Sequence, residues 1–65
     1  MQLLRKVIIY LGKSHAQDKD FLNETWSMAL EESQDTSPDK ASSLAFSELR
    51  ERFGAGVITN AINQS

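Results

Sequence analysis

Gly12-Lys13-Ser14 matches the end of the P-loop pattern, in which backbone N–H groups and a lysine hold phosphate. The complete pattern requires another glycine five positions before Gly12, and this sequence has Val7 there. Such a loop is normally presented by a strand and a helix of an α/β domain, for which 65 residues leave little room. We therefore interpret Gly12 as the end of a helix and expect no nucleotide site.

The other residues capable of chemistry are also poorly placed for it. His15, the one histidine, lies three residues before Asp18, which could form half of a metal site or an oriented base. Zinc needs further ligands, and the chain has no cysteine. Glu31 and Glu32 are adjacent and would point about 100° apart on a helix, and no serine stands in a nucleophile elbow. We expect no catalytic residue, no metal site, no cofactor and no small-molecule substrate, and we predict that the protein is not an enzyme.

Length and composition indicate one small globular domain over residues 1–65. The chain has a mass of 7.3 kDa, with 40% hydrophobic and 25% charged residues. A domain of this size buries only about 60% of the surface that its unfolded chain exposes. The apolar run Val7–Leu11 is too short for a secretion signal or a membrane span. We therefore expect a cytoplasmic protein without a membrane partner.

Hydrophobic periodicity predicts an all-α fold of three or four helices. Residues 2–11 place five apolar side chains within about 140° of a helical wheel: Leu3, Leu4, Val7, Ile8 and Leu11. The β-prone run from Val7 to Tyr10 leaves a buried strand as the alternative. A strand would need pairing partners, and no other segment reads as a strand, so a helix is favoured.

Three further helices are predicted, at 18–32, 38–53 and 56–63. Ser37 is a suitable N-cap, Pro38 suits the first helical position, and Gly54 can end the helix that follows. The polar stretch 33–39 is predicted as the main loop. The expected core comprises nine residues: Leu3, Val7, Leu11, Leu22, Trp26, Leu30, Leu49, Phe53 and Ile58.

Charge is unevenly distributed although the net charge is only −2. Residues 1–13 contain three basic residues and no acid, whereas residues 14–39 contain seven acids and one lysine. Either the first two helices neutralise each other within the fold, or the acidic segment faces a basic partner or a second copy of the chain.

The apolar residues outnumber the inward positions that such a small bundle offers. Ile9 and Leu44 fall outside the apolar faces of their helices, and the helix at 18–32 has an apolar arc of about 200°. Phe21 and Trp26 would be the aromatic anchors of an interface if either is exposed. We therefore predict a non-catalytic interaction or regulatory module that forms a homodimer and binds a protein partner.

A helix-turn-helix DNA-binding regulator is the alternative interpretation, using residues 44–64. The last helix would present polar side chains to the major groove, and two arginines would contact phosphates: Thr59, Asn60 and Asn63, with Arg50 and Arg52. Against this, Arg50 occupies the position where the helices of the motif usually cross at a small residue. The last helix also has no basic residue, and phosphate contacts usually dominate affinity for DNA.

Overall fold

The N-terminal apolar repeat forms a helix. A computed structural model describes all residues, 1–65, and its first helix, α1, spans Gln2–Ser14. The helix buries Leu4, Val7, Ile8 and Leu11, so the strand alternative is wrong. We expected Gly12 to end this helix, but α1 continues for two more residues, to Ser14. It ends at His15, whose backbone N–H donates to the carbonyl of Leu11 at 2.7 Å.

The second helix is longer than predicted. After a 3₁₀ turn at Ala16–Asp18 (η1), α2 spans Lys19–Asp35, so the first three residues of the predicted loop at 33–39 are helical. The hydroxyl of Ser33 donates to the carbonyl of Leu30 at 2.8 Å, and that of Thr36 donates to Glu32 at 2.9 Å. In such bonds a Ser or Thr side chain bonds to a backbone carbonyl three or four residues earlier, so these polar residues can be part of the last helical turn. Only two residues, 36 and 37, separate α2 from the next helix.

The boundaries of α3 are those predicted. The helix spans Pro38–Phe53, and the Ser37 hydroxyl accepts a hydrogen bond from the backbone N–H of Lys40 at 3.2 Å. Gly54 ends the helix with φ 95° and ψ 150°, a backbone conformation that is essentially restricted to glycine. The last helix, α4, follows immediately and spans Ala55–Gln64.

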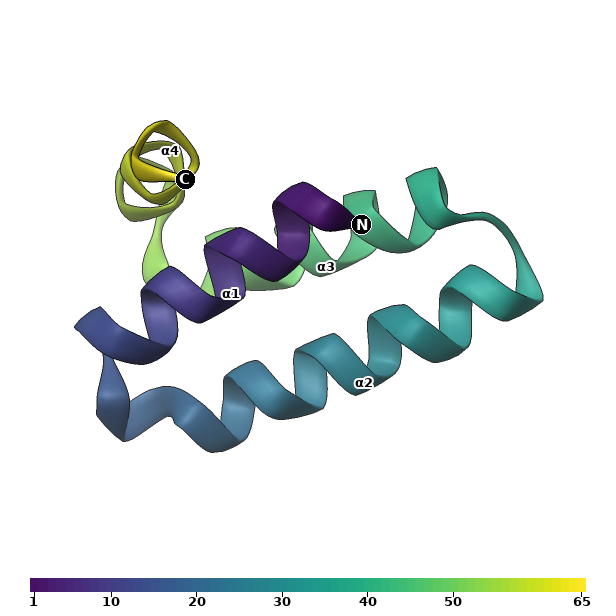
Figure 1. Ribbon diagram of the computed structural model, residues 1–65, viewed down its shortest axis with the longest axis horizontal. Coiled ribbons are helices and arrows are strands. Elements are labelled where there is room, and N and C mark those ends of the chain that lie inside the picture. Colours follow the sequence, from purple (N-terminus) through teal and green to yellow (C-terminus); the bar gives the residue numbers. More distant parts are fainter.

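The first three helices run along the molecule and α4 crosses them. Figure 1 shows α1 in front of α3, both above α2, with α4 seen nearly end-on at the upper left. Helices α1 and α2 are antiparallel, as are α2 and α3. The α2–α3 pair is the most closely packed, and four small side chains are buried there: Thr25, Ala29, Ala41 and Ala45. Small side chains let two helix backbones approach closely.

All four helices contribute to one apolar core. The predictions for Val7, Leu11, Leu22, Leu49 and Ile58 are confirmed, since each is at most 2% exposed. The predictions for Leu3 and Leu30 are wrong. Trp26 and Phe53 pack against the core but remain half-buried.

The two errors in the core have a geometric cause. Leu3 is 44% exposed because its neighbour Leu4 takes the inward position, and adjacent residues point about 100° apart. Leu30 is 42% exposed and lies one turn beyond Trp26, where α1 begins and covers α2 less. None of the four helices combines the length and the hydropathy that crossing a bilayer requires.

Candidate functional site

A shallow groove lies between the start of α1 and the middle of α2. It has a volume of about 360 Å³ and is lined by Met1, Gln2, Arg5, Lys6 and Trp26; we call it the Trp26 groove. The guanidinium carbon of Arg5 lies 5.2 Å from the centroid of the Trp26 ring, within the range of a cation–π contact. The groove therefore combines an aromatic wall with two cationic side chains.

Exposed apolar side chains extend the groove along both helices. Ile9 is one turn after Arg5 on the same side of α1 and is 47% exposed. Leu30 is one turn after Trp26 on α2. The predicted surplus of apolar surface is therefore present here, at Ile9 and at a leucine that we expected in the core.

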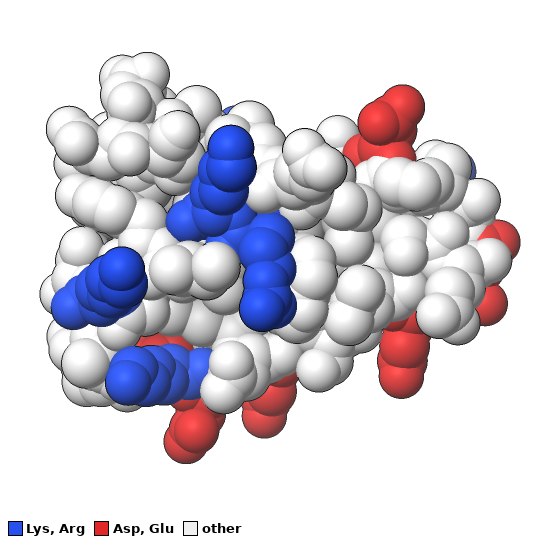
Figure 2. Space-filling model, viewed as in Figure 1, with Lys and Arg blue, Asp and Glu red and all other residues white.

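The cations of α1 form a face of their own. Arg5, Lys6, Ile9 and Lys13 recur at helical spacing and are all exposed; we call them the basic face of α1. In Figure 2 the Lys and Arg side chains gather where α1 and the start of α2 lie, whereas Asp and Glu project from the lower margin and from the right-hand end, including its upper edge. The charge asymmetry of the sequence is therefore also an asymmetry of the surface.

The acids of α2 face away from these cations. Asp20, Glu24 and Glu31 are exposed and share the outer side of α2; we call them the acidic face of α2. The chain forms one ion pair, between Asp18 and Arg52, and none between α1 and α2. The two helices therefore do not neutralise each other by direct pairing.

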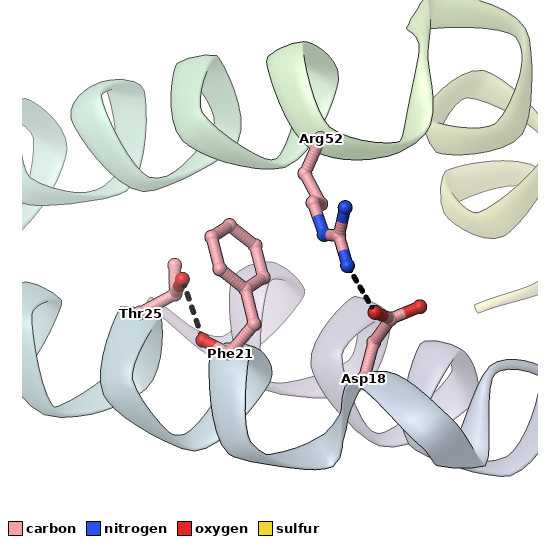
Figure 3. A network of polar contacts seen from close by, with 4 residues as sticks. All are labelled: Asp18, Phe21, Thr25 and Arg52. Carbon is pink, nitrogen blue, oxygen red and sulfur yellow. Dashed lines mark hydrogen bonds and ion pairs between the residues drawn. The ribbon is translucent and has the colours of Figure 1, made fainter.

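That single ion pair joins two distant parts of the chain. Arg52 of α3 donates to the carboxylate of Asp18 at 2.6 Å, and its guanidinium also lies 5.8 Å from the centroid of the Phe21 ring (Figure 3). Phe21 in turn packs edge-to-face on Phe53, with centroids 6.1 Å apart. One turn further along α2, the hydroxyl of Thr25 donates to the carbonyl of Phe21 at 2.9 Å (Figure 3). Phe21 and Arg52 therefore make contacts within the chain that link α2 to α3.

The four predicted interface residues do not form one surface. Trp26 lines the Trp26 groove and Ile9 lies one turn after Arg5, which also lines it, but Phe21 lines a separate groove of about 180 Å³ between α2 and α3. Leu44 is 44% exposed and lies one turn before Glu48, which lines that second groove. The structure thus brings together only the first two of the four.

The predicted DNA-reading side chains are exposed on α4. Thr59, Asn60 and Asn63 face solvent, and the amide of Asn60 donates to the hydroxyl of Tyr10 on α1 at 3.4 Å. The guanidinium of Arg50 lies 5.8 Å from the centroid of the Phe46 ring. Gly54 alone connects the two helices, whereas the usual motif has a turn of three or four residues.

The residues considered for phosphate and metal binding lie at the α1–α2 junction. Gly12, Lys13 and Ser14 are all helical and do not form a loop. The His15 ring packs edge-to-face on Phe53 with centroids 5.1 Å apart, and its buried Nδ1 has no hydrogen-bond partner. Nowhere do three or more His, Asp or Glu side chains gather as metal ligands would.

The chain was compared with protein families, with individual curated proteins and with solved structures. No family model, curated protein or solved structure matches this chain. Any functional assignment must therefore come from its own residues.

Sequence reasoning missed most of the lining of the Trp26 groove. In the sequence, Arg5 and Lys6 stand out only as part of the basic segment at residues 1–13, and periodicity predicts that Leu30 belongs to the core. The wide apolar arc of α2 was the signal that could have found this surface, because Trp26 and Leu30 stand at one edge of it. Their position beside the first turn of α1 depends on how the two helices align, which periodicity does not specify.

Proposed function

We propose that this protein is a non-catalytic interaction module that binds an acidic, amphipathic helix of a protein partner. The binding surface consists of the Trp26 groove and the basic face of α1. The observation that carries the proposal is the half-buried aromatic ring of Trp26 in one groove with Arg5 and Lys6, neither of which has an acidic partner in the chain. A cytoplasmic setting belongs to the same proposal and is supported by the absence of cysteine.

The chemistry of the groove indicates the chemistry of the partner. An apolar side chain of the partner would contact Trp26, and aromatic residues and arginines are the side chains that most often dominate interface energetics. Carboxylates next to that anchor would face Arg5 and Lys6 and give orientation and a faster encounter. A helix with apolar residues at spacings of three and four meets both requirements.

The size of the core supports a role in binding. Only 13 of 65 residues are buried, and five large apolar side chains are at least 36% exposed. Small domains of this kind have a thin stability margin. Covering Ile9, Trp26 and Leu30 with a partner would remove apolar surface from water and add to that margin.

A pair of model peptides tests the proposal. Trp26 is the only tryptophan, so its fluorescence reports directly on the groove. A leucine–glutamate amphipathic helical peptide should change the emission saturably, and a leucine–lysine peptide of the same pattern should not. The double variant Arg5→Ala, Lys6→Ala should weaken binding by about tenfold, since it removes two exposed charge pairs. The matched control is Lys40→Ala on α3. Equal binding of both peptides, or of neither, would overturn the proposal.

DNA binding through residues 44–64 is a second candidate, supported by the exposed side chains of Thr59, Asn60 and Asn63. It is weakened because Arg52 is paired with Asp18. Titration with random-sequence duplex at low salt tests it, because non-specific affinity underlies specific binding. Saturable binding would support this candidate, and Asn60→Ala should then weaken a preferred site more than random sequence. A complete lack of binding would eliminate it.

A further inference from the structure

We infer, on the basis of the proposed function above, that the acidic helix recognised by this surface is α2 of a second copy of the same chain. The basic face of α1 and the acidic face of α2 are both exposed, and no ion pair joins them within one molecule. A surface that carries both halves of a complementary pair is self-complementary. The partner with the required chemistry is therefore already encoded in the sequence.

A two-fold axis satisfies both charged faces at once. In a symmetric dimer, α1 of one copy contacts α2 of the other, and the same contact forms in reverse. Within one chain α1 and α2 are antiparallel, with Arg5 beside Trp26. An axis parallel to these helices keeps that alignment between copies, so each basic face lies level with Asp20 and Glu24 of the opposite acidic face, whereas Glu31 lies beyond the start of α1. In this arrangement α1 of one copy and α2 of the other are antiparallel, and each basic face meets an acidic face rather than another basic face.

Apolar side chains beside the two charged faces add to the same contact. Ile9 lies among the cations of α1, and Trp26 and Leu30 lie on the side of α2 next to α1. An interface of standard size removes about 800 Å² from each partner. That is about a fifth of the 4219 Å² surface of this chain. Because little of this area is a deep pocket, we expect a dissociation constant in the micromolar range or weaker.

Charge exchange between two variants tests the dimer. The variant Lys6→Glu, Lys13→Glu makes both faces acidic, and Asp20→Lys, Glu24→Lys makes both faces basic. For each variant alone, the dissociation constant of the homodimer should rise at least about tenfold above that of the wild type, because like charges then face each other. An equimolar mixture should form a one-to-one heterodimer, because both contacts are again complementary. Sedimentation equilibrium measures all three samples, and circular dichroism confirms that each variant is folded.

Matched controls separate a specific interface from general attraction between oppositely charged proteins. Lys40→Glu, Arg50→Glu and Asp39→Lys, Glu51→Lys produce the same changes in net charge on α3, outside both faces. Each should self-associate as the wild type does, and mixing these two should give no preference for the heterodimer. Wild-type association should weaken between about 0.01 M and 1 M salt, as the Debye length falls from about 30 Å to 3 Å.

The outcomes separate failure of the dimer from failure of the proposed function. A wild type that stays monomeric at millimolar concentration and low salt overturns the dimer, whereas the proposed function is decided by the model peptides. Variants that dimerise as the wild type does would place the interface on another surface. A mixture that fails to restore association contradicts the reciprocal α1–α2 contact. If the two control variants associate on mixing as strongly as the charge-exchanged pair, net charge alone explains the association and the specific interface is contradicted.

Discussion

The guanidinium of Arg5 lies over the indole ring of Trp26, with 5.2 Å between its central carbon and the ring centroid. This contact joins the first turn of α1 to the middle of α2 at the edge of the core. It holds a cation beside a half-buried aromatic ring without any acidic residue to neutralise it. This pair lies within the proposed surface and provides its aromatic ring and one of its cations.

Replacing Arg5 by alanine should expose Trp26. We expect a fluorescence maximum shifted to longer wavelength and a loss of about 0.5–1 kcal/mol in the free energy of unfolding, the value of an exposed cation–π contact. Fluorescence spectra and urea titrations measure the two effects. Lys13→Ala, on the same face but outside the groove, should leave the spectrum unchanged. An identical response of both variants would contradict a specific Arg5–Trp26 contact.

Two adjacent leucines of α1 should respond very differently to truncation. Leu4 is fully buried, so Leu4→Ala should cost about 2–5 kcal/mol and leave much of the protein unfolded. Leu3 is 44% exposed, so Leu3→Ala should change stability by less than about 1 kcal/mol. Thermal unfolding followed by circular dichroism measures both. Equal losses at the two positions would show that α1 is rotated differently on the core.

Two glycines should respond to alanine with opposite sign. Gly54 has φ 95° and ψ 150°, so Gly54→Ala should cost about 1–3 kcal/mol. Gly12 lies within α1 and no atom would crowd an added Cβ there. Gly12→Ala should therefore stabilise the protein by about 0.5–1 kcal/mol. Chemical denaturation distinguishes the two, and destabilisation by Gly12→Ala would mean that α1 ends earlier than Ser14.

Removing the N-cap of α3 should have a moderate effect. The Ser37 hydroxyl accepts from the backbone N–H of Lys40, so Ser37→Ala should cost about 1 kcal/mol. Ser37→Gly should cost only a few tenths of a kcal/mol, because glycine is also accepted at this position. Ser43→Ala, at an exposed position within the helix, is the control. If Ser37→Ala and the control have the same free energy of unfolding, the cap contributes nothing measurable to stability.

The sequence predicted the helices well where local chemistry determines them. Ser37, Pro38 and Gly54 mark the two ends of α3, and the structure places those ends at the predicted residues. At Gly12 and at residues 33–35, glycine and polar residues suggested interruptions, but the helices continue through them. There, continued backbone hydrogen bonding overrides weak local preferences.

The candidate surface was harder to predict because it depends on how helices align. Periodicity assigned Leu3 and Leu30 to the core, yet both lie at the edges of apolar arcs that the small bundle does not fully cover. The pairing of Arg52 with Asp18 joins residues 34 positions apart and has no local signal. Likewise, nothing in the sequence places Trp26 beside Arg5. Such contacts follow from tertiary packing, which a single sequence specifies only indirectly.

The most direct test of the proposed surface is to map backbone and indole N–H chemical shifts by NMR at low salt. Spectra would be compared between dilute and concentrated protein, and with and without the leucine–glutamate peptide. We expect the changes to concentrate on the basic face of α1 and on the indole N–H of Trp26, with the acidic face of α2 responding to protein concentration. Changes confined to Thr59, Asn60 and Asn63, or none at any concentration or with the peptide, would contradict the assignment of this surface to protein binding.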